Sequence, residues 1–467
     1  MRSLSILAKV DLFMLPLMLA ASFLAHLDKN SLAYASALGM TDDLHLHGSQ
    51  YSWLSSLFYV GYLLMQFPNT YILTRMPIGK YLGTSLILWG ACLPTMIAAK
   101  SFASAAVIRF MLGALEAGLL PTCIVLTSCW YRREEQPLRA ALWFGPFSGI
   151  FGGVLAYLVG RTESETPAWK LLFIIYGAST VALGILCLFG LPDSHDNAWF
   201  LSESECKEAR LRTLENRTGA DMHKEWNFAH IQEALVDPKY WVVVVFAICQ
   251  SITNAGITNF SPLILSGFGY SRELTLLLAA PQGGVALVIQ VSASVLALYV
   301  QDIRCLLWIL TCIPAAAGVM IIRFIDVTEY RVTALLGLYL TGFYNTSWVM
   351  AMSLISSNTA GATKKSFASV SMAICYAIGN IVGPHFFLDS QKPEYSLGIS
   401  TMIISFVTMA ICGSLYWSIC MRQNRARDKQ KYLLLPTEEV DEPENSKPIE
   451  TDGDMTDFEM QAFRYTY

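Results

Sequence analysis

Long apolar segments follow one another along almost the whole chain, and they restrict its possible folds more than any other feature. Each holds roughly 20 residues, the length that lets a helix cross the hydrocarbon core of a bilayer. Such segments become helices there because lipid offers no partner to an open backbone. The sequence therefore predicts an all-α polytopic membrane protein with twelve transmembrane helices. The predicted spans are residues 11–36, 51–73, 81–99, 102–130, 138–160, 169–190, 239–261, 274–299, 304–323, 332–355, 366–388 and 397–421.

The composition agrees with a membrane protein and argues against other classes. The 467-residue chain is 54% hydrophobic and 15% charged. Soluble domains carry about 25% charged residues. The 11 cysteines form neither a disulfide framework nor a CxxC zinc pattern. The chain has no GxxxxGKS or GxxxxGKT loop, which disfavours an ATP-driven pump, and no HExxH or GxSxG motif. We therefore expect no enzyme, no cofactor, no metal site and no nucleic-acid partner.

The predicted spans fall into two equal groups. Six precede position 191 and six follow position 238, with a polar linker between them. We expect an N-terminal bundle over 1–190, a cytosolic linker over 191–238 and a C-terminal bundle over 239–421. The linker pattern predicts one short amphipathic helix, in which Ser202-Glu203-Ser204-Glu205 is followed by Lys207–Leu214. The last residues, 422–467, are acidic from position 436 on and lack apolar periodicity, which predicts a disordered cytosolic tail.

Lysine and arginine are unevenly divided between the two sets of predicted loops. With the N-terminus in the cytosol, the inside loops hold about twice as many of these residues as the outside loops. Cytoplasmic loops of membrane proteins carry this excess. We therefore expect both termini in the cytosol, in a multi-pass protein of the plasma membrane.

Four charged residues lie inside predicted spans: Asp28 and Lys29 in the first, Arg109 and Glu116 in the fourth. A charge at membrane depth costs at least ~2.5–3.5 kcal/mol on insertion scales, so such residues are usually functional. Arg109 and Glu116 are seven positions apart and share one helix face, which should look into a bundle or an aqueous cavity. These residues indicate a membrane transporter with its coupling chemistry on spans 1 and 4.

Each of these charges also has a purely structural interpretation. Arg109 and Glu116 could form a buried ion pair that only fixes helix packing. Asp28 and Lys29 could lie near the interface and extend their charged ends to water.

Polar residues also occur in the C-terminal spans. They could hydrogen-bond a substrate across a central cavity, or they could join helices to one another. They are Asn254 and Asn259 on span 7, Tyr344 and Asn345 on span 10, and Asn380 on span 11.

Two further features permit more than one interpretation. His26 neighbours the span-1 charges and could relay protons, although a lone histidine is more often a core residue. Gly145-Pro146, with the glycines that follow on span 5, partly resembles an antiporter signature, but close helix packing explains the same glycines.

Several motifs occur in both halves of the chain. They are Leu27-Asp28-Lys29, Gln50-Tyr51-Ser52-Trp53-Leu54, Arg109-Phe110 with Gly113 and Glu116-Ala117-Gly118, Asn259-Phe260, Ser356-Ser357-Asn358 and Gly379-Asn380-Ile381-Val382-Gly383-Pro384. This pattern is similar to the fungal allantoate permease branch of the anion:cation symporter family, within the major facilitator superfamily, over roughly residues 11–420. The resemblance implies two six-helix bundles, the major facilitator fold.

The resemblance also implies a function. It points to proton symport of small organic anions, such as allantoate, ureidosuccinate or nicotinate-like carboxylates, by alternating access in a monomer. Lys29 and Arg109 would bind the anion, and Asp28 and Glu116 would couple protons. Broader relatives often have arginine where this chain has Lys29. Lysine lacks the bidentate fork of arginine, which favours a monodentate anionic group.

Two rival functions remain open at the level of the sequence. One is proton-coupled efflux of a fungal metabolite, which the same fold could perform. The other is a nutrient receptor that signals without transport, although a long structured tail or linker, its usual mark, is not predicted.

Overall fold

The structure is a computed structural model in which residues 5–73, 75–132, 135–143, 147–214, 227–434, 455–460 and 463–467 are described. In these residues the ordered elements are α-helices and short 3₁₀-helices, with no β-strand. The all-α prediction is confirmed.

The N-terminal half contains the helices up to α10. Several predicted spans are built from two consecutive helices, because a turn or a 3₁₀ segment interrupts them. The elements are α1 (Ile6–Phe13), α2 (Leu15–Ala37), α3 (Met40–Asp43), α4 (Gln50–Leu73), α5 (Ile78–Cys92), η1 (Leu93–Ala98), α6 (Phe102–Glu116), α7 (Leu119–Trp130), α8 (Gln136–Trp143), α9 (Phe147–Gly160) and α10 (Ala168–Gly190).

The C-terminal half repeats this plan after a linker with its own short helices. The linker elements are η2 (His195–Asn197), α11 (Glu203–Leu214) and α12 (Phe228–Val236). The C-terminal elements are α13 (Pro238–Ser266), α14 (Arg272–Tyr299), α15 (Arg304–Phe324), α16 (Arg331–Leu340), η4 (Thr341–Phe343), α17 (Tyr344–Asn358), α18 (Ala362–Val382), η5 (Gly383–Phe386), η6 (Asp389–Gln391) and α19 (Ser396–Leu434).

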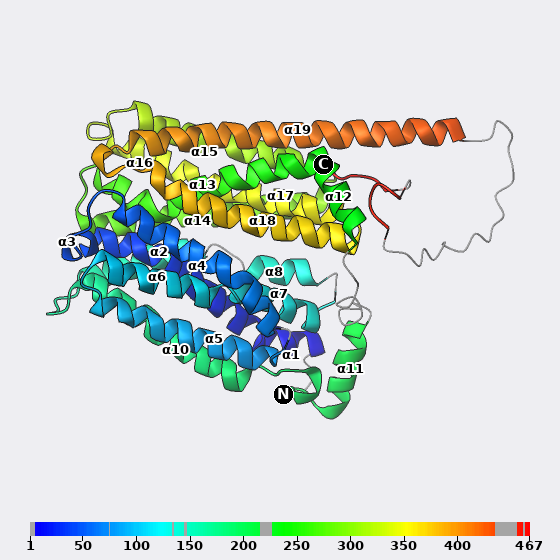
Figure 1. The fold of residues 1–467 in the computed structure, drawn as a ribbon, viewed down its shortest axis with the longest axis horizontal. Helices are drawn as coiled ribbons and strands as arrows, with labels where there is room; N and C mark the ends of the chain where they lie inside the picture. The colour runs from blue at the N-terminus through cyan, green and yellow to red at the C-terminus, as the bar shows by residue number, and fades with distance from the viewer. Residues whose placement is uncertain are drawn as a thin grey trace.

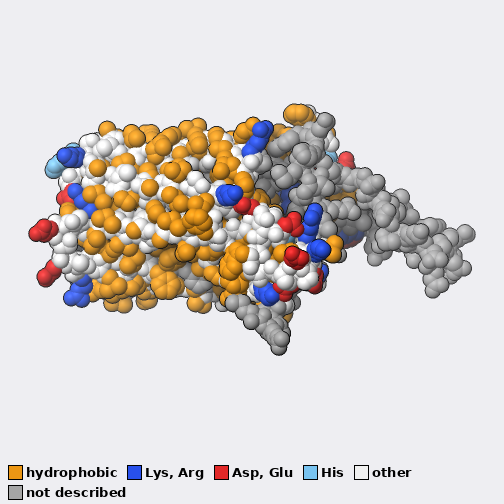
Figure 2. Space-filling view, turned by 90° about the horizontal axis from the view of Figure 1, so that it is seen from below, with side chains coloured by type: hydrophobic (Ala, Val, Ile, Leu, Met, Phe, Trp, Pro, Cys, Tyr) orange, Lys and Arg blue, Asp and Glu red, His pale blue; other side chains and the backbone are white. Residues whose placement is uncertain are grey.

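The two halves lie side by side, with their helices roughly along one common axis (Figure 1). Both termini and the linker helices α11 and α12 lie at one end of the bundle, which we call the linker end. Hydrophobic side chains cover the flank of the molecule, and most charged side chains gather toward its two ends (Figure 2). This distribution is that of a protein whose flank faces lipid and whose ends face water.

Nine helices in the described residues are long and apolar enough to cross a membrane. Two of the other three predicted spans have identifiable irregularities: helix α4 has 24 residues but carries several polar side chains, and η4 interrupts α16–α17. In the third, residues 144–146 between α8 and α9 lie outside the described residues. Each piece still runs through the bundle, so the twelve-helix fold holds.

The linker and the tail differ from the sequence expectation. The predicted linker helix is α11, but α12 was not predicted. The tail prediction is wrong for the described residues: α19 continues as a helix to Leu434, and residues near the C-terminus, such as Asp457 and Tyr465, are buried. Acidic composition suggested disorder, yet basic side chains at the linker end supply the matching charges.

Helices α9 and α14 cross closely where the two halves meet. A Cβ added to Gly283 would lie 2.6 Å from the carbonyl carbon of Gly149, and a Cβ on Gly153 would lie 2.6 Å from the Leu276 oxygen. Such distances leave no room for a side chain against backbone. The glycines on α9 therefore permit close packing between the halves. This agrees with the helix-packing interpretation of the span-5 glycines given in the sequence analysis.

We expect Gly283→Ala to destabilise the protein, because the added methyl group collides with the α9 backbone and overpacking costs about 1–3 kcal/mol. Gly284, the next residue on α14, has no atom within 4 Å of an added Cβ, so Gly284→Ala is a matched control. Thermal unfolding of the two purified variants measures the difference. Equal unfolding temperatures would contradict the close crossing.

Candidate functional site

A cavity of about 580 Å³ lies between the two halves. Helices α2, α4, α6, α7, α8 and α9 line it from the N-terminal half, and α13, α14, η4, α17 and α18 line it from the C-terminal half. It extends toward the linker end, where its lining residues Ser356 and Lys365 are exposed to solvent, and we call this its mouth. A central cavity between two repeated bundles is where secondary transporters bind substrate.

Lys29 and Glu116 face each other in this cavity. The Lys29 Nζ lies 3.0 Å from Glu116 Oε1, and the Lys29 side chain is 18% exposed whereas that of Glu116 is 2% exposed. The Lys29 ammonium also lies 5.8 Å from the centroid of the Tyr62 ring. Glu116 Oε2 has no hydrogen-bond partner among the described residues. The cavity therefore contains an ion pair with one carboxylate oxygen uncommitted.

Asp28 and Arg109 form a second contact behind the cavity wall. The Arg109 Nη1 lies 3.9 Å from Asp28 Oδ1, and both side chains are almost fully buried. Asp28 also accepts hydrogen bonds from Trp89 Nε1 at 2.9 Å and Ser31 Oγ at 3.1 Å. The Arg109 guanidinium lies 4.9 Å from the Phe58 ring centroid. Neither Asp28 nor Arg109 lines the cavity.

The charges thus pair across helices and not within them, for a geometric reason. Adjacent residues on a helix point about 100° apart, so Asp28 and Lys29 cannot share one face. Arg109 and Glu116 do share a face, but seven residues separate them by about 10.5 Å along the axis. Each charge on α2 therefore meets a different charge on α6.

In the C-terminal half, the predicted polar residues are linked to one another. Tyr344 donates to Asn254 Oδ1 at 2.9 Å, and Asn254 Nδ2 donates to Asn380 Oδ1 at 2.9 Å. Asn345 donates to Gln290 at 3.0 Å. Asn254, Tyr344 and Asn345 line the cavity, whereas Asn380 lies behind them. Asn380 therefore orients Asn254 and does not face the cavity.

Asn259 lies apart from the cavity, at the end opposite to the linker end, which we call the sealed end. Its side chain donates to Ala255 O, and its backbone oxygen accepts a hydrogen bond from Tyr51 at 2.8 Å. Nearby, Ser52 and Ser56 of α4 donate to backbone oxygens of α18 and η5. These bonds join the two halves, so Asn259 contributes to closing that end.

Some cavity residues were not identified from the sequence. Gln250 and Thr258 flank Asn254 at intervals of four on α13, so one polar stripe faces the cavity. The interval of four is visible in the sequence and would have predicted this polar stripe. Aromatic side chains on other elements also line the cavity, and no local sequence pattern predicts them. They are Tyr34, Tyr59, Tyr62, Trp143, Trp348 and Tyr376.

Two candidates from the sequence remain, His26 and Gly145-Pro146. His26 lines the cavity, with Nδ1 2.8 Å from the Ser22 carbonyl oxygen, so both of its interpretations stay open. Gly145-Pro146 lie outside the described residues.

The sequence matches the Major Facilitator Superfamily over residues 18–384. An uncharacterized transporter of Schizosaccharomyces pombe is 33% identical, over 99% of this chain and 87% of that protein. The allantoate permease of Saccharomyces cerevisiae is 32% identical, over 98% of this chain and 85% of the permease.

The fold is also that of a solved transporter structure. The crystal structure of a D-xylose–proton symporter superposes with a TM-score of 0.64 at 13% identity, covering 88% of this chain and 98% of that one. Together with the cavity between two six-helix halves, these likenesses establish a multi-pass membrane transporter and not an enzyme. The chain belongs to the major facilitator superfamily, in its fungal allantoate permease-like branch.

Proposed function

We propose that the protein is a proton-coupled symporter of small organic anions that works by alternating access in the plasma membrane, with both termini and the linker end in the cytosol. The observation that carries this proposal is the Lys29–Glu116 pair at 3.0 Å in the cavity wall. It supplies a cation for the substrate and a carboxylate for the proton in one place. One chain holds the whole cavity, which is consistent with a monomeric carrier.

The pair couples the two ligands by simple electrostatics. An anionic substrate that binds Lys29 brings a second negative group next to Glu116. Two carboxylates that share one cation repel each other, and this repulsion is relieved when one of them takes up a proton. Substrate and proton therefore favour each other's binding, as symport requires.

The remaining cavity chemistry supports a substrate with amide-like groups. Carboxamide side chains of Gln250, Asn254, Gln282 and Asn345 line the wall, and each can both donate and accept hydrogen bonds. The surrounding aromatic rings favour a flat substrate. A ureido carboxylate such as allantoate or ureidosuccinate has this chemistry, and the likeness to an allantoate permease points the same way. A nicotinate-like carboxylate satisfies the aromatic part.

The other predicted site residues act through these groups. Asp28 and Arg109 fix the α2–α6 contact beside the pair, so we assign them a positioning role and leave proton transfer to Glu116. Asn380 orients Asn254, and Asn259 belongs to the sealed end. Lys29, Asn254, Tyr344 and Asn345 are the proposed substrate contacts.

Uptake measurements test the proposal. Cells that lack their own carriers would express the protein and receive labelled allantoate, ureidosuccinate or nicotinate at acidic and neutral pH, with and without a protonophore. We expect accumulation that rises at acidic pH and collapses with the protonophore. If none of these anions accumulates despite confirmed surface delivery, symport is wrong, and efflux from preloaded cells then separates export from a receptor function.

We expect Lys29→Ala to weaken anion binding strongly while the protein still reaches the membrane. The variant removes the cation that faces the cavity, and a charged hydrogen bond contributes about 1.5–3 kcal/mol, equivalent to about 10- to 150-fold in affinity. The concentration dependence of initial uptake measures the effect. Lys100→Ala, at an exposed position, is the control. An unchanged apparent affinity would assign Lys29 to helix packing.

A further inference from the structure

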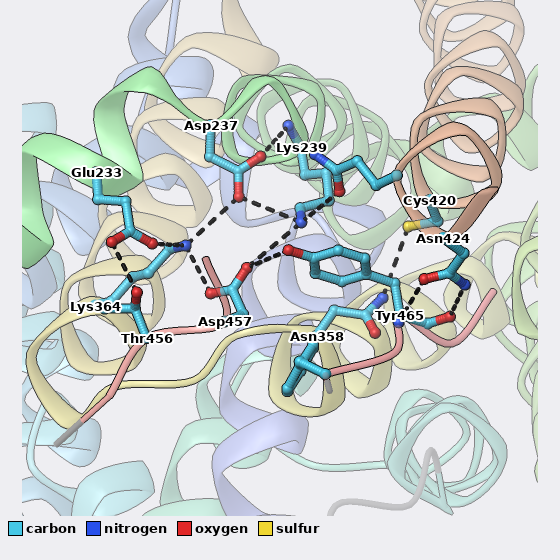
Figure 3. A network of polar contacts seen from close by, with 12 residues as sticks. Glu233, Asp237, Lys239, Asn358, Lys364, Cys420, Asn424, Thr456, Asp457 and Tyr465 are labelled. Atoms are coloured by element: carbon cyan, nitrogen blue, oxygen red, sulfur yellow. Dashed lines mark hydrogen bonds and ion pairs between the residues drawn. The ribbon is translucent and has the colours of Figure 1, made fainter. Parts of the chain in front are cut away.

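The end of the chain folds back onto the linker end of the C-terminal half. We call the described residues 455–460 and 463–467 together the C-terminal clasp. Thr456 and Asp457 are fully buried, and Tyr465 is 2% exposed. Figure 3 shows Asp457 among basic side chains from other elements. Such burial of an acidic chain end needs specific partners.

Asp457 is held by two lysines. Its Oδ1 lies 2.6 Å from Lys364 Nζ, its Oδ2 lies 3.6 Å from Lys239 Nζ, and Tyr465 donates to Oδ2 at 2.8 Å (Figure 3). Burial raises the pKa of Asp457, but the hydrogen bond and charge of Lys364 together with Lys239 outweigh it, so the pKa lies below its usual range. Asp457 is therefore ionised at neutral pH.

The lysines that hold Asp457 also pair with carboxylates of the linker end. Lys364 contacts Glu233 at 2.7 Å and Asp237 at 3.7 Å, and Lys239 contacts Asp237 at 3.5 Å. Arg427 of α19 donates to the carbonyl oxygen of Asp457 at 2.6 Å. Asp457 therefore joins a network of two lysines and three carboxylates, and removing the clasp would take one carboxylate partner from each lysine.

The clasp backbone is bound as specifically as its charges. Asn424 exchanges two hydrogen bonds with the backbone of Tyr465, at 2.8 and 3.0 Å. Asn358 does the same with the backbone of Thr466, at 2.8 Å each. The clasp therefore ties together the linker-end tips of most C-terminal spans. The tying residues are Lys239 of α13, Asp302 between α14 and α15, Asn358 of α17, Lys364 of α18, and Asn424 and Arg427 of α19.

Two of these tips also form the mouth of the cavity. Asn358 follows Ser356 on α17, and Lys364 precedes Lys365 on α18. Ser356 and Lys365 line the cavity at its open end. In alternating access, this mouth has to close while the sealed end opens. Closure requires the tips of α17 and α18 to approach the N-terminal half.

We propose that the C-terminal clasp is autoinhibitory: when docked, it holds the tips of α17 and α18 in the position that keeps the cavity mouth open, and its release allows the mouth to close. Beside these polar contacts, Tyr465 lies in the hydrophobic core and Phe463 and Tyr467 pack against it, so release of the clasp exposes aromatic side chains as well as charges. Because clasp and binding site belong to one chain, docking is intramolecular and does not depend on protein concentration.

The first test measures docking by hydrogen exchange of the purified full chain. Asp457→Asn removes the buried carboxylate charge, and losing a charge-assisted hydrogen bond should raise the undocked population about tenfold or more. Exchange at the clasp residues 455–460 and 463–467 should accelerate. The matched control is Asp428→Asn, because Asp428 makes an exposed ion pair with Arg464, and exposed pairs contribute little. Equal exchange in both variants would overturn the role of Asp457.

The second test reads the mouth directly and needs no substrate. Ser369 lines the cavity and is exposed to it. In a Ser369→Cys background, the rate of maleimide alkylation at this position, read by peptide mass spectrometry, reports how often the mouth is open. We expect a lower rate with Asp457→Asn than with Asp428→Asn. An equal or higher rate would overturn the proposal, whatever the transported substrate is.

A third variant fixes the clasp in place. The hydroxyl oxygens of Ser357 and Thr466 lie 3.1 Å apart, so cysteines there are within disulfide reach. Ser357→Cys with Thr466→Cys should slow initial uptake of labelled allantoate under oxidation, and a reductant should restore it. Oxidised wild type controls for the native cysteines. Uptake that is unaffected by the disulfide would overturn autoinhibition, whereas no uptake in any variant, wild type included, would count against the proposed substrate only.

Discussion

Replacing Glu116 with glutamine is expected to abolish uphill accumulation of substrate and to leave exchange of substrate across the membrane measurable. Glutamine keeps the size of the side chain and its ability to accept a hydrogen bond from Lys29, but it cannot take up a proton. Lys29 then remains available to an anion, so binding survives. The proton gradient, however, no longer has a group in the cavity on which to act.

Two measurements on reconstituted vesicles separate these effects. Net uptake against a concentration gradient, driven by an imposed pH difference, should vanish in Glu116→Gln. Exchange of labelled internal for unlabelled external substrate should persist. Glu273→Gln, at an exposed position on α14, should behave as wild type in both assays. A wild-type accumulation ratio in Glu116→Gln would show that another group carries the proton.

Much of the fold could be predicted from the sequence because lipid imposes one simple requirement. A span must be apolar and long enough, so the twelve segments were visible one by one. The prediction was less accurate where a span is irregular. Serines and other polar residues on α4, which contribute hydrogen bonds to the sealed end, also lower its hydropathy. In such a helix, the polar residues that the function requires make the span harder to recognise from its hydropathy.

The candidate site was only partly predictable, because pairing depends on the rotation and height of neighbouring helices. The sequence identified four charges on α2 and α6. It suggested Asp28 with Lys29 and Arg109 with Glu116, whereas the contacts run from Lys29 to Glu116 and from Arg109 to Asp28. The sequence of one segment shows which residues share a helix face. It does not show which charge on a second helix lies opposite that face.

The structure of the clasp could not be predicted from its composition either. An acidic, aperiodic segment favours disorder when it is considered by itself. Its fold depends on Lys239, Lys364 and Asn358, which are far away in the sequence. Nothing local relates Asp457 to these residues.

The crosswise pairing leads to a second large effect, at Arg109. We expect Arg109→Met to destabilise the protein by about 3–5 kcal/mol, because it leaves the Asp28 carboxylate buried without its cation. Trp89 and Ser31 would still donate hydrogen bonds to Asp28, but they carry no charge. Thermal unfolding and the yield of folded protein measure the loss. Arg161→Ala, at an exposed position, serves as the control.

A double-mutant cycle identifies the cause of that loss. Combining Asp28→Asn with Arg109→Met removes both charges, so most of the stability lost in Arg109→Met alone should return. Additive losses would mean that the two side chains act independently. A stable Arg109→Met protein that no longer binds anion would contradict the positioning role and place Arg109 at the substrate. Because Arg109 lies behind the cavity and Lys29 faces it, we expect the two residues to separate cleanly: loss of folded protein at Arg109, and loss of anion affinity at Lys29.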